Sequence, residues 1–125
     1  EDEGESWDYH YFPKFNENDV RSYCRGVLLK ADNPDVMFVG NGDFIPGVTG
    51  AIQRTTNAGK TWEPVSLPVE PNSVVYWLGT HPERPNVIVA ASLFGYLYVS
   101  EDGGDNWKKL KKEFGEIRSV VIVPN

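Results

Sequence analysis

Three stretches of the sequence carry the same polar, glycine and tryptophan residues at similar spacing. The two full copies read TTNAGKTW and SEDGGDNW, and the opening EDEGESW lacks the first part of the phrase. An Asp or Asn side chain can accept hydrogen bonds from backbone N–H groups two residues further on, and glycine can adopt a positive φ. The predicted chemistry is therefore the closing of a tight turn, by Asp2, Gly4 and Trp7, by Asn57, Gly59 and Trp62, and by Asp102, Gly104 and Trp107.

The other polar residues lack the spacing of a metal site or a catalytic motif. SEDGGDN is rich in oxygen ligands but does not have the spacing of a calcium-binding EF-hand loop. His10 and His81 have no second histidine at ligand spacing, and Cys24 is the single cysteine. The sequence contains no nucleophile-elbow, zinc-protease or phosphate-loop motif. We predict no metal, no cofactor and no catalytic residue in this chain.

Composition and charge limit the classes of partner. The 125 residues have the length of one domain, with 40% hydrophobic residues and a net charge of −6. Such an acidic chain is not predicted to bind nucleic acid or an anionic membrane surface. Its apolar runs are shorter than the roughly 18 residues of a membrane span. The start EDEGES has neither Met nor a basic signal segment, so we expect an N-terminus made by processing, and the compartment is not indicated.

Short antiparallel strands are the elements predicted to position these phrases. Trp7, Trp62 and Trp107 lie 55 and 45 residues apart, and apolar runs recur between them at similar intervals. Gly, Pro and Asn separate the runs, which is typical of strands joined by turns. Each unit has four predicted strands: A over 22–31, 73–80 and 117–123; B over 36–40 and 87–92; C over 50–56 and 95–100; D over 7–12, 61–66 and 106–111.

Units of four strands that repeat about every 40–50 residues are typical of β-propeller blades. The repeated phrase resembles the Asp-box, or BNR repeat, of sialidases, sortilin-type receptors, xyloglucan-cleaving enzymes and photosystem II assembly factors. The resemblance covers nearly the whole chain. It implies an all-β fold of antiparallel four-stranded blades, with the boxes on the rim of the propeller and away from its ligand face.

The truncated first phrase predicts a partial β-propeller. We expect the C-terminal part of a propeller of roughly six to eight blades. Residues 1–15 would supply the outer strand of a preceding blade, 16–70 and 71–114 one complete blade each, and 115–125 the inner strand of a further blade. The expected partners are the remaining N-terminal propeller polypeptide or symmetry-related copies of the chain.

Candidate ligand-binding residues lie on the inner strands and on loops above the channel, because rigid scaffolds carry their binding sites on such loops. The loop 41–49, between strands B and C of the first complete blade, is six residues longer than its counterpart in the second. The alternative role for these side chains is plain packing or an ordinary surface loop. The candidates are Asn41, Asp43, Phe44, Tyr76, Trp77, Phe94, Tyr96 and Arg118.

The inner strands can be aligned on the prolines that follow them. With Pro34, Pro82 and Pro124 in register, Tyr76 falls opposite Leu28 and Arg118. An arginine that faces a channel can bind a carboxylate through two parallel hydrogen bonds. This alignment therefore predicts Arg118 as a ligand-binding residue beside Tyr76.

Two classes of function remain open. The first is a non-catalytic scaffold or binding protein, similar to an assembly factor, that holds a protein or peptide on the channel face. The alternative is a glycoside hydrolase or carbohydrate-binding propeller whose catalytic residues lie outside this chain. None of the five arginines stands in the F/Y-R-I-P signature of sialidases, since DFIP at residues 43–46 contains no arginine. The sequence favours the binding protein, with a protein or glycan ligand.

Overall fold

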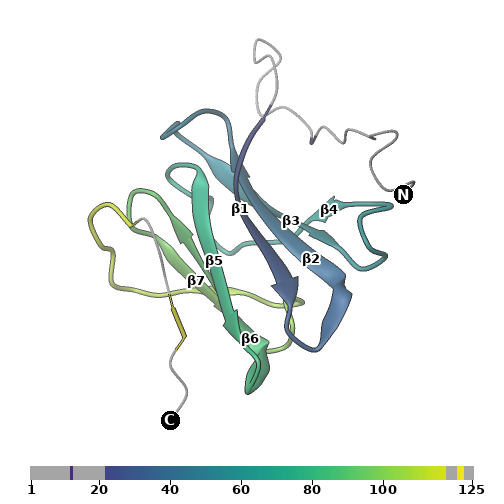
Figure 1. The fold of residues 1–125 in the computed structure, drawn as a ribbon. Coiled ribbons are helices and arrows are strands. Elements are labelled where there is room, and N and C mark those ends of the chain that lie inside the picture. Colours follow the sequence, from purple (N-terminus) through teal and green to yellow (C-terminus); the bar gives the residue numbers. More distant parts are fainter. Residues whose placement is uncertain (1–11, 13–21, 118–120, 123–125) are drawn as a thin grey trace.

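The computed structural model describes residue 12, residues 22–117 and residues 121–122. They form two four-stranded antiparallel sheets, which we call the first and second blade (Figure 1). The first blade contains β1 (Tyr23–Lys30), β2 (Asn33–Gly42), β3 (Gly50–Thr55) and β4 (Glu63–Pro64), in that order across the sheet. The second contains β5 (Val75–His81), β6 (Arg84–Ser92), β7 (Leu97–Ser100) and β8 (Lys108–Lys109).

Every element in the described part of the chain is a strand. The same residues include no helix long and apolar enough to cross a membrane. Val, Ile, Phe and Tyr are frequent in these strands because their side chains pack well on a pleated surface. The predicted all-β class with antiparallel four-stranded blades is therefore confirmed.

The hydrophobic core lies between the two blades. Side chains of a strand alternate between the two faces of its sheet, so each strand sends every second residue into this layer. The first strands of the two sheets, β1 and β5, lie side by side (Figure 1). The buried side chains of this core are Phe38, Ile52, Val75, Leu78, Ile88, Ala90, Tyr98 and Trp107.

A turn over residues 100–107, which we call the second box turn, joins β7 to β8. Asp102 Oδ1 accepts the backbone N–H of Asn106 at 2.9 Å, and Ser100 Oγ accepts that of Gly104 at 2.8 Å. The indole of Trp107 donates to the Gly104 carbonyl oxygen at 2.8 Å. Hydrogen bonds from the backbone N–H of Asn106, from its side chain and from Ser100 lower the pKa of the Asp102 carboxyl group to about 2. The polar residues of the phrase therefore satisfy backbone groups of the turn.

The first box turn, residues 55–62 between β3 and β4, uses the same arrangement with Asn57 in place of the aspartate. Asn57 Oδ1 accepts the backbone N–H of Thr61 at 2.9 Å. The indole of Trp62 donates to the Gly59 carbonyl oxygen at 3.1 Å. The third phrase, with Asp2, Gly4 and Trp7, lies outside the described residues.

The second box turn also packs on the first blade. The rings of Phe38 and Trp107 meet edge to face, with centroids 6.2 Å apart. Gly104 has a φ of +99°, and a Cβ placed on it would lie 2.5 Å from Cζ of Phe38. Arg54 Nη1 reaches Asp105 Oδ1 of the turn at 2.7 Å. This turn therefore contributes to the joint between the blades.

The observed strand limits differ from the predicted ones mainly at the outer edge and at the long loop. β4 and β8 have two residues each, against the six predicted for each outer strand. β2 continues to Gly42, so the loop spans 43–49 and Asn41 belongs to a strand. The first blade lies within 16–70 and the second within 71–114. The roles predicted for 1–15 and 115–125 concern residues that are largely undescribed, and they stay predictions.

The predicted proline alignment is wrong by three residues. The turn between β1 and β2 is closed by Lys30 and Asn33, and the turn between β5 and β6 by His81 and Arg84. Pro34 therefore corresponds to Pro85, the second residue of β6, while Pro82 lies within the turn. Consequently Leu28 is not the counterpart of Tyr76.

Candidate binding surface at the loop end of the blades

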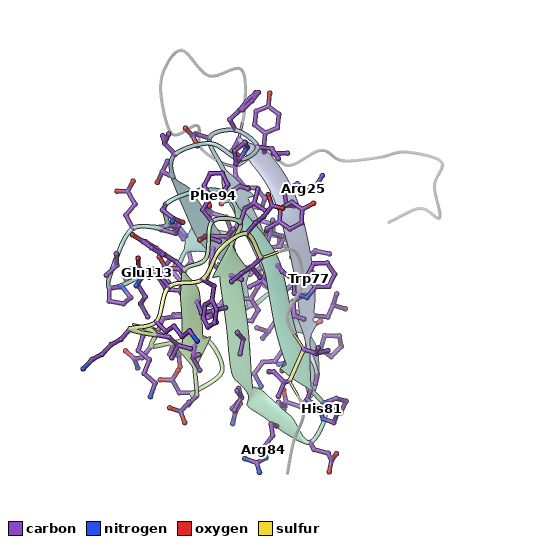
Figure 2. The ribbon with its side chains drawn as sticks, turned by 90° about the vertical axis from the view of Figure 1, so that its left-hand side faces the viewer. Arg25, Trp77, His81, Arg84, Phe94 and Glu113 are labelled. Atoms are coloured by element: carbon purple, nitrogen blue, oxygen red, sulfur yellow. The ribbon has the colours of Figure 1, made fainter. Side chains whose placement is uncertain are left out.

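The two blades have a box end and a loop end. β3 begins after the loop 43–49 and ends at the first box turn, so this loop and the turn lie at opposite ends of the sheet. The short β6–β7 connection, residues 93–96, lies at the loop end of the second blade. Figure 2 shows Arg25 and Phe94 at this end and His81 and Arg84 at the other. The long loop thus lies away from both described box turns.

Asp43 holds the long loop together. Its Oδ1 accepts the backbone N–H groups of Val48 and Thr49, at 3.0 and 3.2 Å. The carbonyl oxygen of Pro46 accepts the backbone N–H of Val74 at 2.8 Å, which ties the loop to the segment between the blades. The Asp43 carboxylate is therefore already engaged within the loop, and its role in this structure is to shape it.

Phe44 projects from this loop and is exposed. Its ring meets Tyr23, the first residue of β1, edge to face at 5.3 Å between centroids. Asn41, predicted beside it, is fully buried. The Asn41 side-chain oxygen accepts a long bond of 3.4 Å from Gln53, and its nitrogen has no hydrogen-bond partner among the described residues. Phe44 is thus available to a ligand in this structure and Asn41 is not.

Phe94 and Tyr96 flank the β6–β7 connection with different surroundings. Phe94 is exposed, and its backbone is fixed on both sides. Its N–H donates to Ser73 Oγ at 2.9 Å and its carbonyl oxygen accepts a bond from Asn72 at 3.0 Å. The ammonium group of Lys109 lies over the ring of Tyr96, 4.3 Å from the ring centroid. Of the two predicted aromatic contacts, Phe94 therefore presents the freer ring.

Each inner strand contains two register shifts, and the first shift in each strand brings a pair of side chains together. In β1 the pairing shifts between Cys24 and Gly26, and in β5 between Val75 and Trp77. The residues at these β-bulges are Arg25 and Tyr76. Arg25 and Tyr76 therefore hold equivalent positions in consecutive blades.

The two bulge residues make a direct contact. Arg25 Nη2 donates to the hydroxyl oxygen of Tyr76 at 2.9 Å, and the guanidinium carbon lies 4.8 Å from the ring centroid. A bulge bends its strand and re-aims the side chain at that point. The geometry therefore places a cation, steadied by an aromatic ring, at the inner edge of both sheets.

The remaining predicted residue, Trp77, follows this bulge. It is exposed and labelled on the face of the second blade in Figure 2. Gly26 of the first blade lies against its backbone, since a Cβ there would be 3.4 Å from Cα of Trp77. Arg118 lies outside the described residues. Of the predicted residues, Tyr76 thus contacts Arg25, which the sequence analysis did not predict as a site residue.

The described residues contain no group of three or more His, Cys, Asp and Glu side chains arranged to hold a metal ion. Cys24 lies at the same inner edge as the Arg25–Tyr76 pair. Desolvation raises the pKa of its thiol, which does not favour the thiolate form needed by a nucleophile. The chemistry of this surface is therefore that of hydrogen bonds, ionic contacts and exposed aromatic rings.

Comparison with known proteins identifies the family. A family model described as "Sortilin, neurotensin receptor 3" of the Sortilin-Vps10 group matches residues 1–120. The chain belongs to the sortilin Vps10 family. Sortilin of Danio rerio is 28% identical to this sortilin-type chain over 85 residues, which make up 68% of the chain and 10% of that protein.

A solved structure shares the fold of the sortilin-type chain. The crystal structure of an ancestral GH74 enzyme matches 70% of the chain and 13% of its own, with a TM-score of 0.59 and 22% identity. This likeness concerns the fold alone, and together with the family match it shows a propeller of the sortilin and BNR type. The chain spans about a tenth of the length of these relatives.

The sequence of this sortilin-type chain contains a signal for Arg25, which the alignment on Pro82 did not identify. DNPDV and ERPNV align without a gap and put Pro34 on Pro85, an offset of 51 residues. The same offset applied to the preceding strand puts Arg25 on Tyr76. Alignment on Pro82 instead hid this correspondence, because that proline belongs to a turn and not to a strand.

Proposed function

We propose that this sortilin-type chain supplies two neighbouring blades of a non-catalytic propeller that holds a protein or peptide partner on its channel face. The observation that carries the proposal is the pair of matched bulges in β1 and β5, which bring Arg25 and Tyr76 into contact. The inner strands of a propeller surround its central channel. Bulges are frequent beside functional sites because they redirect one side chain while the rest of the sheet stays paired.

The Arg25–Tyr76 pair suits a carboxylate on the partner. A guanidinium group offers a planar fork of N–H donors that matches the two oxygens of a carboxylate. Tyr76 occupies one of these donors and steadies the group, so the others keep a defined direction. Within the described residues Arg25 forms no ion pair with an acidic side chain. No acidic side chain of the described residues neutralises Arg25, and we propose that a carboxylate of the partner does so.

The outer faces of the blades support a position within a larger propeller. The first blade exposes Val27 and Leu29 of β1, and the second exposes Trp77 of β5. A repeat of this kind packs its apolar face on the next repeat. We therefore propose that further blades cover these faces, supplied by the rest of the propeller polypeptide or by symmetry-related copies.

The glycoside hydrolase alternative requires two carboxyl groups placed across a glycosidic bond. The carboxylates on the loops of this end, Asp43 and Glu70, each hold a loop. Asp43 binds backbone N–H groups and Glu70 accepts the hydroxyl of Thr49. This engagement favours the binding role. Release of sugar from a polysaccharide by the purified protein would contradict it.

An array of synthetic peptides tests the carboxylate site. Each peptide is made with Asp or Glu and again with Asn or Gln, so that a pair differs only in charge. We expect the purified protein to prefer the acidic member, and Arg25→Gln to remove the preference with a loss of roughly 10-fold or more in affinity. Arg84→Gln is the matched control, because Arg84 is an exposed arginine at the opposite end (Figure 2). Equal binding by both variants would refute the assignment.

A further inference from the structure

Three connections at the loop end expose apolar side chains. They are the loop 43–49, the segment 65–74 between the blades and the connection 93–96. Exposed fractions are 58% for Phe44, 76% for Val48, 44% for Val69 and 42% for Phe94. We call these four side chains the loop platform. Large apolar side chains exposed on neighbouring connections are typical of contact surfaces.

Hydrogen bonds join the three connections to one another. The bond from Val74 N–H to the Pro46 carbonyl ties the first to the second, at 2.8 Å. The bond from the Asn72 side chain to the Phe94 carbonyl ties the second to the third, at 3.0 Å. The hydroxyl of Tyr98 in β7 also donates to the Val69 carbonyl at 2.8 Å. The platform is therefore held in place before any partner arrives, which lowers the entropic cost of binding.

The charged residues within these connections are acidic, but Lys109 of β8 lies over the ring of Tyr96 in the third connection, 4.3 Å from the ring centroid. Asp43 and Glu70 are the charged residues of the three segments, all of which the structure describes. Glu70 is exposed and Asp43 is partly exposed. The acidic part of the platform, formed by the loop 43–49 and the segment 65–74, attracts Lys and Arg on a partner and repels acidic side chains or anionic lipid headgroups. Shape and charge together therefore specify apolar groups accompanied by a positive charge.

We propose that the loop platform binds a polypeptide segment in which apolar side chains stand next to a lysine or arginine. The apolar groups contact Phe44, Val48, Val69 and Phe94, and the cation lies near Glu70. This inference rests on the proposed function and deepens it, because it specifies the partner's chemistry at a second place on the same end. A partner that uses both places carries a carboxylate for Arg25 and a cation for Glu70.

A second peptide array tests the platform. Each peptide contains two or three Leu or Phe residues and is made in two versions. One version has Lys or Arg beside these residues, and the other has Gln at the same position. We expect stronger binding by the cationic member and a decrease of that preference as salt is raised. Phe44→Ser and Phe94→Ser should each weaken binding by about tenfold, as for central contacts of an interface. Leu110→Ser is the control, since Leu110 is an exposed apolar residue outside the three connections.

Glu70→Lys supplies a test that does not depend on removing an aromatic ring. It should reverse the charge preference, so that peptides with Glu beside the apolar residues bind best. An unchanged preference in Glu70→Lys, or no loss in both phenylalanine variants, would refute the platform. Binding to anionic lipid vesicles in place of the cationic peptides would also refute it.

The two proposals fail in different ways. Arg25→Gln could weaken the binding of acidic peptides while the platform variants leave the binding of every peptide unchanged. This result would overturn the platform and leave the proposed function standing. If neither the Arg25 variant nor the platform variants changed the affinity of any peptide, both proposals would be overturned.

Discussion

Gly104 provides a direct test of how the second box turn joins the blades. A methyl group at this position meets two separate obstacles. The φ of +99° lies in the region that residues other than glycine avoid, at a cost of about 1–2 kcal/mol. The new Cβ would also lie 2.5 Å from Cζ of Phe38, whose ring is fully buried against Trp107. Overpacking of a core typically costs about 1–3 kcal/mol. Gly104→Ala should therefore lower the free energy of unfolding by about 2–5 kcal/mol.

Gly59 is the matched control in the first box turn. Its φ is +88°, so an alanine meets the same backbone cost. The nearest atom to its Cβ, however, is Cε of Met37 at 3.5 Å, which is an ordinary contact. Gly59→Ala should lose only the backbone part, about 1–2 kcal/mol. The difference between the variants measures the contact between the second box turn and Phe38.

Urea unfolding followed by tryptophan fluorescence gives both values on the purified protein. A lower midpoint at an unchanged slope means a change in stability alone. Equal losses in the two variants would refute the reasoning, because they would show that the Phe38 ring moves aside at no cost. A larger loss in Gly59→Ala would refute it as well.

Two further predictions concern the box turns. Trp107→Ala should lower the free energy of unfolding by about 3–5 kcal/mol, and Trp62→Ala by clearly less, because Trp107 is buried in the joint between the blades while Trp62 is partly exposed. Thermal unfolding measures both changes, and an equal loss of stability in the two variants would contradict the assignment. Hydrogen bonds from the backbone N–H and side chain of Asn106 and from Ser100 hold the pKa of Asp102 at about 2, below its ordinary value of about 3.9. A carboxyl group whose pKa is lower in the folded state stabilises the fold above about pH 4 and loses this effect as pH falls through about 2. Asp102→Asn keeps an acceptor oxygen without the titration, so its Tm deficit relative to the native protein should shrink over this range, and a constant deficit would contradict the prediction.

Much of the fold was predictable because its information is local. The box turns close through side chains and backbone groups within eight residues, so TTNAGKTW and SEDGGDNW could be interpreted without any distant contact. Strand class followed from apolar runs separated by Gly, Pro and Asn. The outer strands were predicted too long because residue type does not show where pairing with the neighbouring strand stops. In the structure β4 pairs with two residues of β3, and β8 pairs with two residues of β7.

The candidate surface was predictable only in part. The extra length of the loop 43–49 identified Phe44 as a candidate, and the structure leaves it exposed. It also showed that Asn41 is buried in β2 and that Asp43 binds its own loop. Burial and hydrogen-bond partners depend on what packs around a residue, which residue type and spacing do not specify.

What the sequence by itself determined is the repeated unit: four short strands, a polar turn and a tryptophan, in a chain of the propeller type. The tertiary structure alone decided which residues of different units meet. Arg25 and Tyr76 are 51 residues apart, and they meet because a bulge occurs at the same place in β1 and β5. Phe44, Val69 and Phe94 share one end because hydrogen bonds between three separate connections hold them there. Strand register and contacts between blades are long-range properties, and they are settled when the two sheets pack against each other.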